Sequence, residues 1–173
     1  MQMDLSLELN LPLAAAAPFE DYIARYQQLV YRTAWRMLGA TGDAEDACQE
    51  VFLKLYSRLG DFEKAPNPSA WLYRVTVNHC LDVLRKRRPQ AESTVVELLP
   101  ALENPEAAAA FEQQKQRLAR LLLRLPVGER SALVLRDLEG LSTREVAAIL
   151  EVSEETVRTA IHRAKEKLRQ WMS

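Results

Sequence analysis

Residues 141–163, LSTREVAAILEVSEETVRTAIHR, contain two short helical patterns with only three residues between them. The first pattern ends at Leu150 and the second begins at Glu154. Ser142 and Glu145 have the spacing of a capping box, and Ser153 is placed to cap the second helix. A short helix, a tight turn and a longer helix have the proportions of a helix-turn-helix, in which the second helix is held out for a partner.

The second of these helices has one apolar face and one polar face. Its core-facing residues recur at spacings of four, three, four and three: Val157, Ile161, Ala164, Leu168 and Trp171. The opposite face carries Thr159, His162 and Arg163. A solvated face with ion pairs is the alternative for a lone helix, but the preceding helix and turn favour insertion into the major groove of DNA. Arg163 is predicted to read a base, and Arg158, Lys165 and Lys167 to contact phosphates.

Composition and charge agree with a helical protein that contacts a polyanion at two places. The 173 residues include only five glycines and are rich in Ala, Leu, Arg and Glu, which predicts an all-α fold. The formal net charge is -1. Residues 71–90 nevertheless carry five basic residues against Asp82 alone, and residues 156–173 carry five against Glu166 alone, so each segment has a net charge of +4.

The pattern along the chain predicts two small helical domains. Residues 1–18 are expected to be a flexible extension and residues 91–110, which are acidic, a flexible linker between domains at 19–90 and 111–173. The first domain is predicted to hold three helices: 19–38, a second capped by Asp43 that runs to about 58, and a third capped by Ser69 that runs from 70 to about 88. A loop with two prolines separates the last two. Helices at about 106–124 and 126–140 precede the helix-turn-helix.

The second predicted helix carries an exposed leucine among acidic residues. On a helical wheel Leu53 falls within the arc of Asp46, Gln49 and Glu50, opposite the apolar face. This pattern is typical of the anchor of a contact with a basic protein and excludes a DNA surface.

The third predicted helix lines up aromatic, amide and basic groups. Trp71, Arg74, Asn78 and Arg85 share one side, and the helix ends in four consecutive basic residues at 85–88. Such a surface can stack on bases, bond their edges and neutralise phosphates of opened DNA. A core position for Trp71 and a structural role for Arg74 are the alternatives.

No pattern for a metal, a cofactor or catalysis is found in the sequence. Cys48 and Cys80 lack the spacing of zinc ligands, and His79 beside Cys80 has no further ligands to complete a shell. No paired carboxylates with metal-binding spacing, glycine-rich phosphate loop or nucleophile and base set occurs. Without a membrane-spanning stretch or a basic signal segment, we expect a cytoplasmic protein with reduced cysteines, no cofactor and no membrane insertion.

Three segments, DAEDACQEVF at 43–52, WLYRVTVN at 71–78 and EGLSTREVAAILEVSEETVRTAIHRAKEK at 139–167, together resemble bacterial sigma factors of the extracytoplasmic-function (ECF) group. The resemblance covers about 19–90 and 106–171. It implies a subunit that binds RNA polymerase core, directs it to promoters with -35 and -10 elements, and promotes DNA melting. An anti-sigma factor is a further expected partner.

The resemblance also implies roles for particular residues. It would place six residues against the clamp helices of the largest polymerase subunit: Asp43, Glu45, Asp46, Gln49, Glu50 and Leu53. The -10 element would be contacted by Phe62, Trp71, Arg74, Asn78, Arg85, Lys86, Arg87 and Arg88, with Asn78 and the loop at 61–69 at the pocket for a flipped base. The -35 element would be contacted by Arg144, Thr156, Arg158, Thr159, His162, Arg163, Lys165 and Lys167. Ala160 and His162 depart from residues common in the group, so the group's commonest -35 sequence is not assumed.

Two other classes of protein compete with this interpretation. A two-domain regulator of the LuxR type, acting on duplex operator DNA, has a similar terminal helix-turn-helix but leaves the segments at 43–52 and 71–78 unexplained. An enzyme acting on nucleic acid is disfavoured by the lack of a catalytic pattern.

Overall fold

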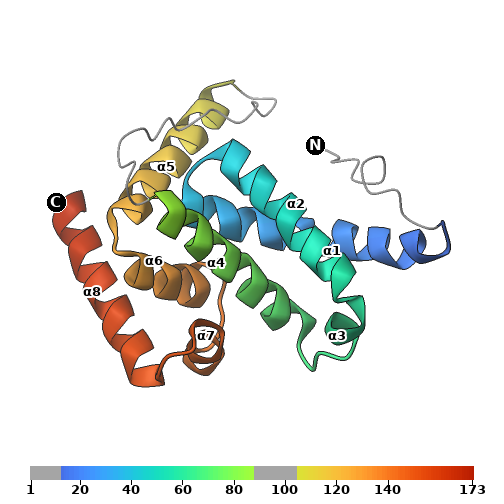
Figure 1. Ribbon diagram of the computed structural model, residues 1–173. Helices are drawn as coiled ribbons and strands as arrows, with labels where there is room; N and C mark the ends of the chain where they lie inside the picture. Colours follow the sequence, from blue (N-terminus) through green and yellow to red (C-terminus); the bar gives the residue numbers. More distant parts are fainter. Residues whose placement is uncertain (1–12, 88–104) are drawn as a thin grey trace.

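The computed structural model describes residues 13–87 and 105–173, and the side chains of 19–87 and 109–173 (Figure 1). The described residues form helices and no strand, so the all-α class predicted from the sequence is confirmed. The elements in chain order are α1 (Leu13–Leu38), α2 (Thr41–Ser57), α3 (Leu59–Glu63), α4 (Pro68–Arg87), α5 (Pro105–Arg124), α6 (Val127–Leu133), the π-helical η1 (Val134–Leu138), α7 (Thr143–Leu150) and α8 (Glu154–Met172).

Helices α1, α2 and α4 pack on one another to form the N-terminal unit, with α3 joining α2 to α4. The apolar arc of α2 is buried as its periodicity predicts: Val51, Phe52 and Leu55 are at most 1% exposed. They pack with Phe19 of α1 and Leu72 of α4. This burial fixes α2 so that its acidic face remains outside.

In the C-terminal unit, α8 packs across α6 and α7. Val157 and Ala164 are buried, and Ile161, Leu168 and Trp171 are partly buried against the same core. The predicted apolar stripe of this helix is therefore confirmed. Its burial turns the opposite face, with His162 and Arg163, to solvent.

The two units are packed against each other and share apolar clusters. Tyr73 and Val77 of α4 belong to one cluster with Leu135 and Val146. Figure 1 shows α4 lying between the other N-terminal helices and the helices α6 and α7. Gly39, which ends α1 with φ +78°, allows a close approach of α5, because a Cβ there would collide with Leu123.

Several element boundaries differ from those predicted. Helix α1 begins at Leu13 rather than at Phe19, because the alanine tract has high helix propensity. The predicted extension was therefore too long, and residues 1–12 lie outside the described residues. Helix α3 falls in a segment that the sequence assigned to the end of α2 and a loop.

Two predicted helix caps are wrong. Asp43 lies in the first turn of α2, whose N-cap position is Ala40, and its carboxylate is taken by Arg87. At α4 the oxygen of Asn67, not that of Ser69, accepts a hydrogen bond from the Ala70 backbone at 3.1 Å. Pro68 at the first helical position moves the start of this helix ahead of Ser69.

Candidate nucleic-acid interface

The helix-turn-helix begins with the predicted capping box. The Ser142 backbone N–H donates to Glu145 Oε2 at 2.8 Å, and the Glu145 N–H donates to Ser142 Oγ at 3.2 Å. The bond from the Ser142 backbone lowers the pKa of the Glu145 carboxyl below its usual value. Both groups thereby satisfy backbone donors that would otherwise lack partners at the start of α7.

The turn between the helices depends on a left-handed residue that is not glycine. Glu151 has φ 57° and ψ 42°, and the Val152 N–H donates to the Ala147 carbonyl at 3.1 Å. Such a conformation is uncommon for a residue with a side chain, so it was not predicted for Glu151. Ser153 then caps α8 as predicted, because its Oγ accepts from the Thr156 N–H at 3.1 Å.

The outer face of α8 carries the residues predicted to contact the -35 element. His162 and Arg163 are exposed, and Thr159 is half-buried. His162 lies 3.5 Å from Glu166, whereas among residues 13–87 and 105–173 no acidic group pairs with Arg163. Arg163 is thus the cation of this face that is free to bind a partner. The other exposed members of the predicted set are Arg144, Thr156, Arg158 and Lys165, and Lys167 is half-buried.

Three basic residues of α8 are held by acidic residues of their own unit. Arg158 lies 2.9 Å from Glu154, Lys165 is 2.7 Å from Asp137, and the Lys167 Nζ is 2.8 Å from Glu129. A phosphate would have to replace these carboxylates. The ion pairs of Lys165 and Lys167 also tie α8 to the preceding helices, a second role that the sequence did not reveal.

Helix α4 brings together the exposed residues predicted to contact opened DNA. Arg74, Asn78, Arg85 and Lys86 are all exposed on it, and Arg85 lies 3.2 Å from Asp82. The other predicted basic residues of this segment are Arg87, which forms two hydrogen bonds of 2.6 Å with Asp43, and Arg88, which lies outside the described residues.

Phe62 is not available for DNA contact, contrary to the prediction. Its side chain is 1% exposed, in the centre of an aromatic group in which Tyr22, Tyr26 and Trp71 meet it edge to face. The short helix α3 turns Phe62 inward, where burial of the ring is favourable. Trp71 is half-buried in the same group, so it has the core contacts considered as its alternative role.

The predicted protein-contact surface on α2 is solvent-exposed. Leu53 is 38% exposed, and Asp46 and Glu50 are exposed beside it. We call these three residues, with the half-buried Gln49, the α2 patch. The remaining predicted members, Asp43 and Glu45, are half-buried at the start of the helix.

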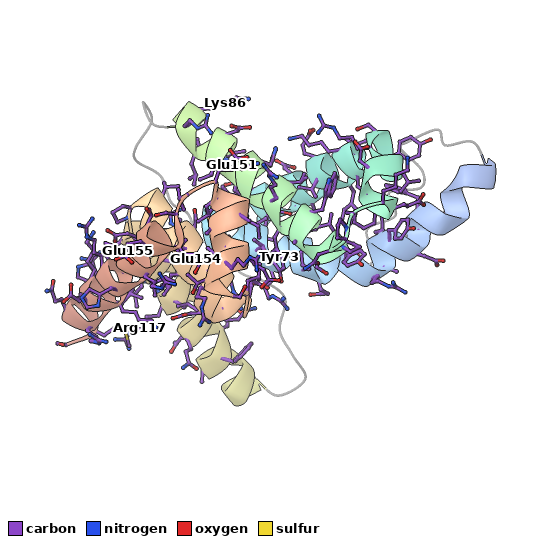
Figure 2. The ribbon with its side chains drawn as sticks, turned by 90° about the horizontal axis from the view of Figure 1, so that it is seen from below. Tyr73, Lys86, Arg117, Glu151, Glu154 and Glu155 are labelled. Carbon is purple, nitrogen blue, oxygen red and sulfur yellow. The ribbon has the colours of Figure 1, made fainter. Side chains whose placement is uncertain are left out.

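One cluster of charged side chains was missed by the sequence analysis. The Glu139 side chain is fully buried and accepts hydrogen bonds from Arg32, Arg36 and Tyr73 of the N-terminal unit. Nearby, the exposed Arg74 of α4 pairs with Glu151 of the helix-turn-helix, and Figure 2 shows Glu151 against α4. Local periodicity gives no signal for contacts between residues so distant in sequence.

Neither a metal site nor a membrane-spanning helix is found in the described part of the chain. No three His, Cys, Asp or Glu side chains there are grouped to hold a metal ion. No helix in the same ranges has the length and apolarity needed to cross a membrane.

Two family models match the chain: Sigma-70 region 2 over residues 22–90 and Sigma-70 region 4 over residues 115–168. The ECF RNA polymerase sigma factor SigW of Bacillus subtilis (strain 168) is 33% identical over 162 residues, which are 87% of each chain. The ECF RNA polymerase sigma-E factor of Escherichia coli (strain K12) is 34% identical over 161 residues, or 87% of this chain and 84% of that one. The region 2 match includes the segments at 43–52 and 71–78 that a LuxR-type regulator leaves unexplained, so that alternative is not supported.

Solved structures give the same architecture. CnrH in complex with the cytosolic domain of CnrY is similar with a TM-score of 0.67, 28% identity and coverage of 89% of this chain and 86% of that one. The sigma factor RpoE in complex with the anti-sigma factor NepR from Bartonella quintana has a TM-score of 0.70 at 21% identity, with coverage of 90% and 96%. This second likeness concerns the fold alone.

Proposed function

Because this chain belongs to the ECF group of the sigma-70 family, the sigma factors that direct RNA polymerase to promoters, we propose that three of its surfaces divide that work. The α2 patch binds polymerase core, the exposed side of α4 binds the -10 element as it opens, and the outer face of α8 binds the -35 element. The domains of this division are 19–90 and 111–173, joined by residues 91–110.

The observation that carries the proposal is the separation of charge between these surfaces. The α2 patch has Asp46 and Glu50 around the exposed Leu53, and it would repel a phosphate backbone. The exposed sides of α4 and α8 carry arginines, of which Arg163 is unpaired within the described ranges. An acidic surface with an apolar anchor fits a basic protein, and the two basic surfaces fit nucleic acid.

The chain has no chemistry of its own in this proposal. It acts by binding, and polymerase core carries out RNA synthesis. We place this activity in the cytoplasm, where polymerase and chromosome meet. An anti-sigma factor is a further proposed partner. The sequence resemblance implies one, and the similar CnrH was solved in complex with the cytosolic domain of a second protein, CnrY.

The test starts with binding to purified core polymerase. Leu53→Asp should weaken binding at least about tenfold, because it puts a charge in place of the apolar anchor. Gln28→Asp, which adds the same charge on the exposed side of α1, is the control and should bind like the wild type. Unchanged binding of Leu53→Asp would contradict the role of the α2 patch.

The second arm tests promoter direction. The holoenzyme is given a library of promoters with randomised -35 and -10 positions, and transcripts are sequenced. We expect enriched sequences at both elements. Transcripts independent of both elements, or duplex binding that needs no polymerase, would contradict the proposal.

A further inference from the structure

The N-terminal and C-terminal units are joined by a buried ionic cluster. Glu139 directly follows η1 in the C-terminal unit, and its side chain is 0% exposed. The Arg32 Nε lies 3.1 Å from Glu139 Oε1, and its Nη2 lies 2.6 Å from Oε2. Arg36, one turn further along α1, bonds the same carboxylate. All the donors to this carboxylate among the described residues therefore come from the other unit.

Tyr73 completes the cluster from α4. Its hydroxyl donates to Glu139 Oε2 at 2.9 Å. Burial, and then the nearby carboxylate, raise the pKa of Tyr73 to about 12, so the hydroxyl keeps its proton and remains a donor. The Glu139 hydrogen bonds also raise the pKa of Arg32. Two cations and a neutral donor thus compensate one buried anion.

The backbone of the η1 region delivers Glu139 to this position. The Glu139 N–H donates to the Val134 carbonyl at 2.9 Å, a π-helical bond, and Gly140 with φ +78° then ends the helix. The Leu141 N–H returns to the Leu135 carbonyl at 3.1 Å. Such π turns place one residue out of the regular helical register and are frequent at functional sites.

A second contact shows that the packed arrangement cannot engage both promoter elements. Arg74, predicted to contact the -10 element, pairs with Glu151 in the turn that precedes α8. The two elements are about 25 base pairs apart, which at roughly 3.4 Å per pair is about 85 Å. Side chains in direct contact cannot serve sites at that separation. The units must come apart on the promoter, and Glu139 must leave its three donors.

We propose that Glu139, held by Arg32, Arg36 and Tyr73, is an intramolecular lock that keeps the free protein closed and is released when polymerase and promoter are bound. The release of the lock on the promoter rests on the proposed function, whereas the lock itself is a property of the free chain. A buried carboxylate suits this role, because removing one partner of a buried ion pair leaves an uncompensated charge. In the open form Glu139 and its three donors are hydrated, so mutating any of them changes the free energy of that form little.

Energy transfer between dyes on the two units reports closure in the full chain. Dyes are attached at Lys64→Cys, between α3 and α4, and Val152→Cys, beside Glu151 in the turn that contacts α4; both sites are exposed, whereas Cys48 and Cys80 are buried. The wild type should show high transfer. Glu139→Gln keeps the shape but removes the charge, so the ratio of open to closed protein should rise at least about tenfold.

Asp137→Asn is the matched control. It neutralises an acidic residue of η1 two positions away, whose partner Lys165 belongs to the same unit. Transfer should remain as in the wild type. Arg32→Gln is the second opening variant, because the half-exposed Arg32 side chain can be shortened without a cavity in the core. Circular dichroism checks that each variant is folded. If Glu139→Gln does not fold, the energy transfer of Arg32→Gln tests the lock.

The outcomes separate the lock from the sigma function. Lower transfer in every opening variant that is folded, but not in Asp137→Asn, supports the lock even if no promoter is found. Transfer unchanged from the wild type in a folded opening variant overturns it. Adding core polymerase and promoter DNA to the wild type should lower the energy transfer at least as much as the opening variants do. High transfer in an active promoter complex would overturn release of the lock without touching the sigma function.

Discussion

The Arg130 Nη1 donates a hydrogen bond to the carbonyl oxygen of Met37, 2.6 Å away in the last turn of α1. Arg130 lies on α6 and is 4% exposed. Its Nη2 also donates to the carbonyls of Leu123 and Leu125, each at 3.1 Å. One buried guanidinium therefore satisfies the end of α1 and the end of α5 together, and it links the two units independently of Glu139.

Arg130→Ala should lower the free energy of unfolding by about 2 kcal/mol or more, because two buried carbonyls and one partly buried carbonyl lose a charged donor. Arg130→Lys should recover only part of this loss, since an ammonium lacks the planar fork. Urea denaturation followed by circular dichroism measures both. Arg136→Ala, on the exposed side of η1, is the control and should cost less than about 0.5 kcal/mol. Equal losses for Arg130→Ala and Arg136→Ala would contradict the role of Arg130.

The pair of Asp43 and Arg87 should make stability depend on pH. Hydrogen bonds from Arg87 lower the pKa of Asp43 below its ordinary value of 3.8. A carboxyl with a lowered folded pKa contributes stability above its unfolded pKa and loses it as the pH falls through the folded pKa. Because both groups are partly exposed, the contribution is less than about 1 kcal/mol.

Asp43→Asn should therefore be less stable than the wild type at pH 7, and the difference should vanish once the pH has fallen below the lowered pKa of Asp43. Urea unfolding from pH 7 downward measures it. Asp61→Asn, on the exposed side of α3, forms no ion pair among the described residues and should follow the wild type throughout. A difference between Asp43→Asn and the wild type that persists at low pH would have another cause than this pair.

Most of the fold follows from local patterns. The helices of both units other than α3, the capping box at Ser142 and the cap at Ser153 were predicted because each depends on residues within one or two turns. The wrong caps show the limit of such rules. Asp43 has the right residue type for a cap, but a partner 44 positions away takes its carboxylate. Pro68 and Asn67 likewise decided the start of α4 against Ser69.

The candidate site was predictable where it depends on one helix face. The exposure of Leu53 on α2 and of Arg163 on α8 follows from periodicity. Phe62 was misplaced because its burial depends on rings from α1 and α4. The Glu139 cluster was missed for the same reason, since the packing of one unit on the other gives no periodic signal.

Asn78 tests the role of α4 in DNA melting. Asn78 is exposed on the same side as Arg74. A base must leave the stack before an amide on this surface can bond its edge. Asn78→Ala should therefore reduce the open complex about tenfold while the closed complex forms normally. Permanganate footprinting of unpaired thymines reports melting, and gel shift reports closed-complex binding.

Gln28→Ala removes an exposed amide from α1 and should melt promoters like the wild type. Normal melting by Asn78→Ala, with only recruitment of polymerase impaired, would show that this face of α4 does not contact the opened strand.

Two arginines of α8 are predicted to contact DNA in different ways, Arg163 through a base and Arg158 through a phosphate. Arg163 is exposed and unpaired in the described part of the chain, so its fork is available for a guanine edge. Arg163→Ala should cost about 1 to 3 kcal/mol at one promoter position and relax the preference there. Arg158 is held by Glu154 at 2.9 Å on the flank of the face, where a phosphate would replace the carboxylate.

Arg158→Ala should weaken binding to all sequences alike and reduce the salt slope by about one. Transcription from a library of randomised -35 elements, repeated at several salt concentrations, measures both effects. Lys167→Ala provides the comparison, because Lys167 is already paired with Glu129. This variant should weaken DNA binding less than Arg158→Ala does, and it should also lower the stability of the protein. If Arg163→Ala weakens every sequence equally and relaxes no position, α8 holds the DNA but Arg163 does not read it.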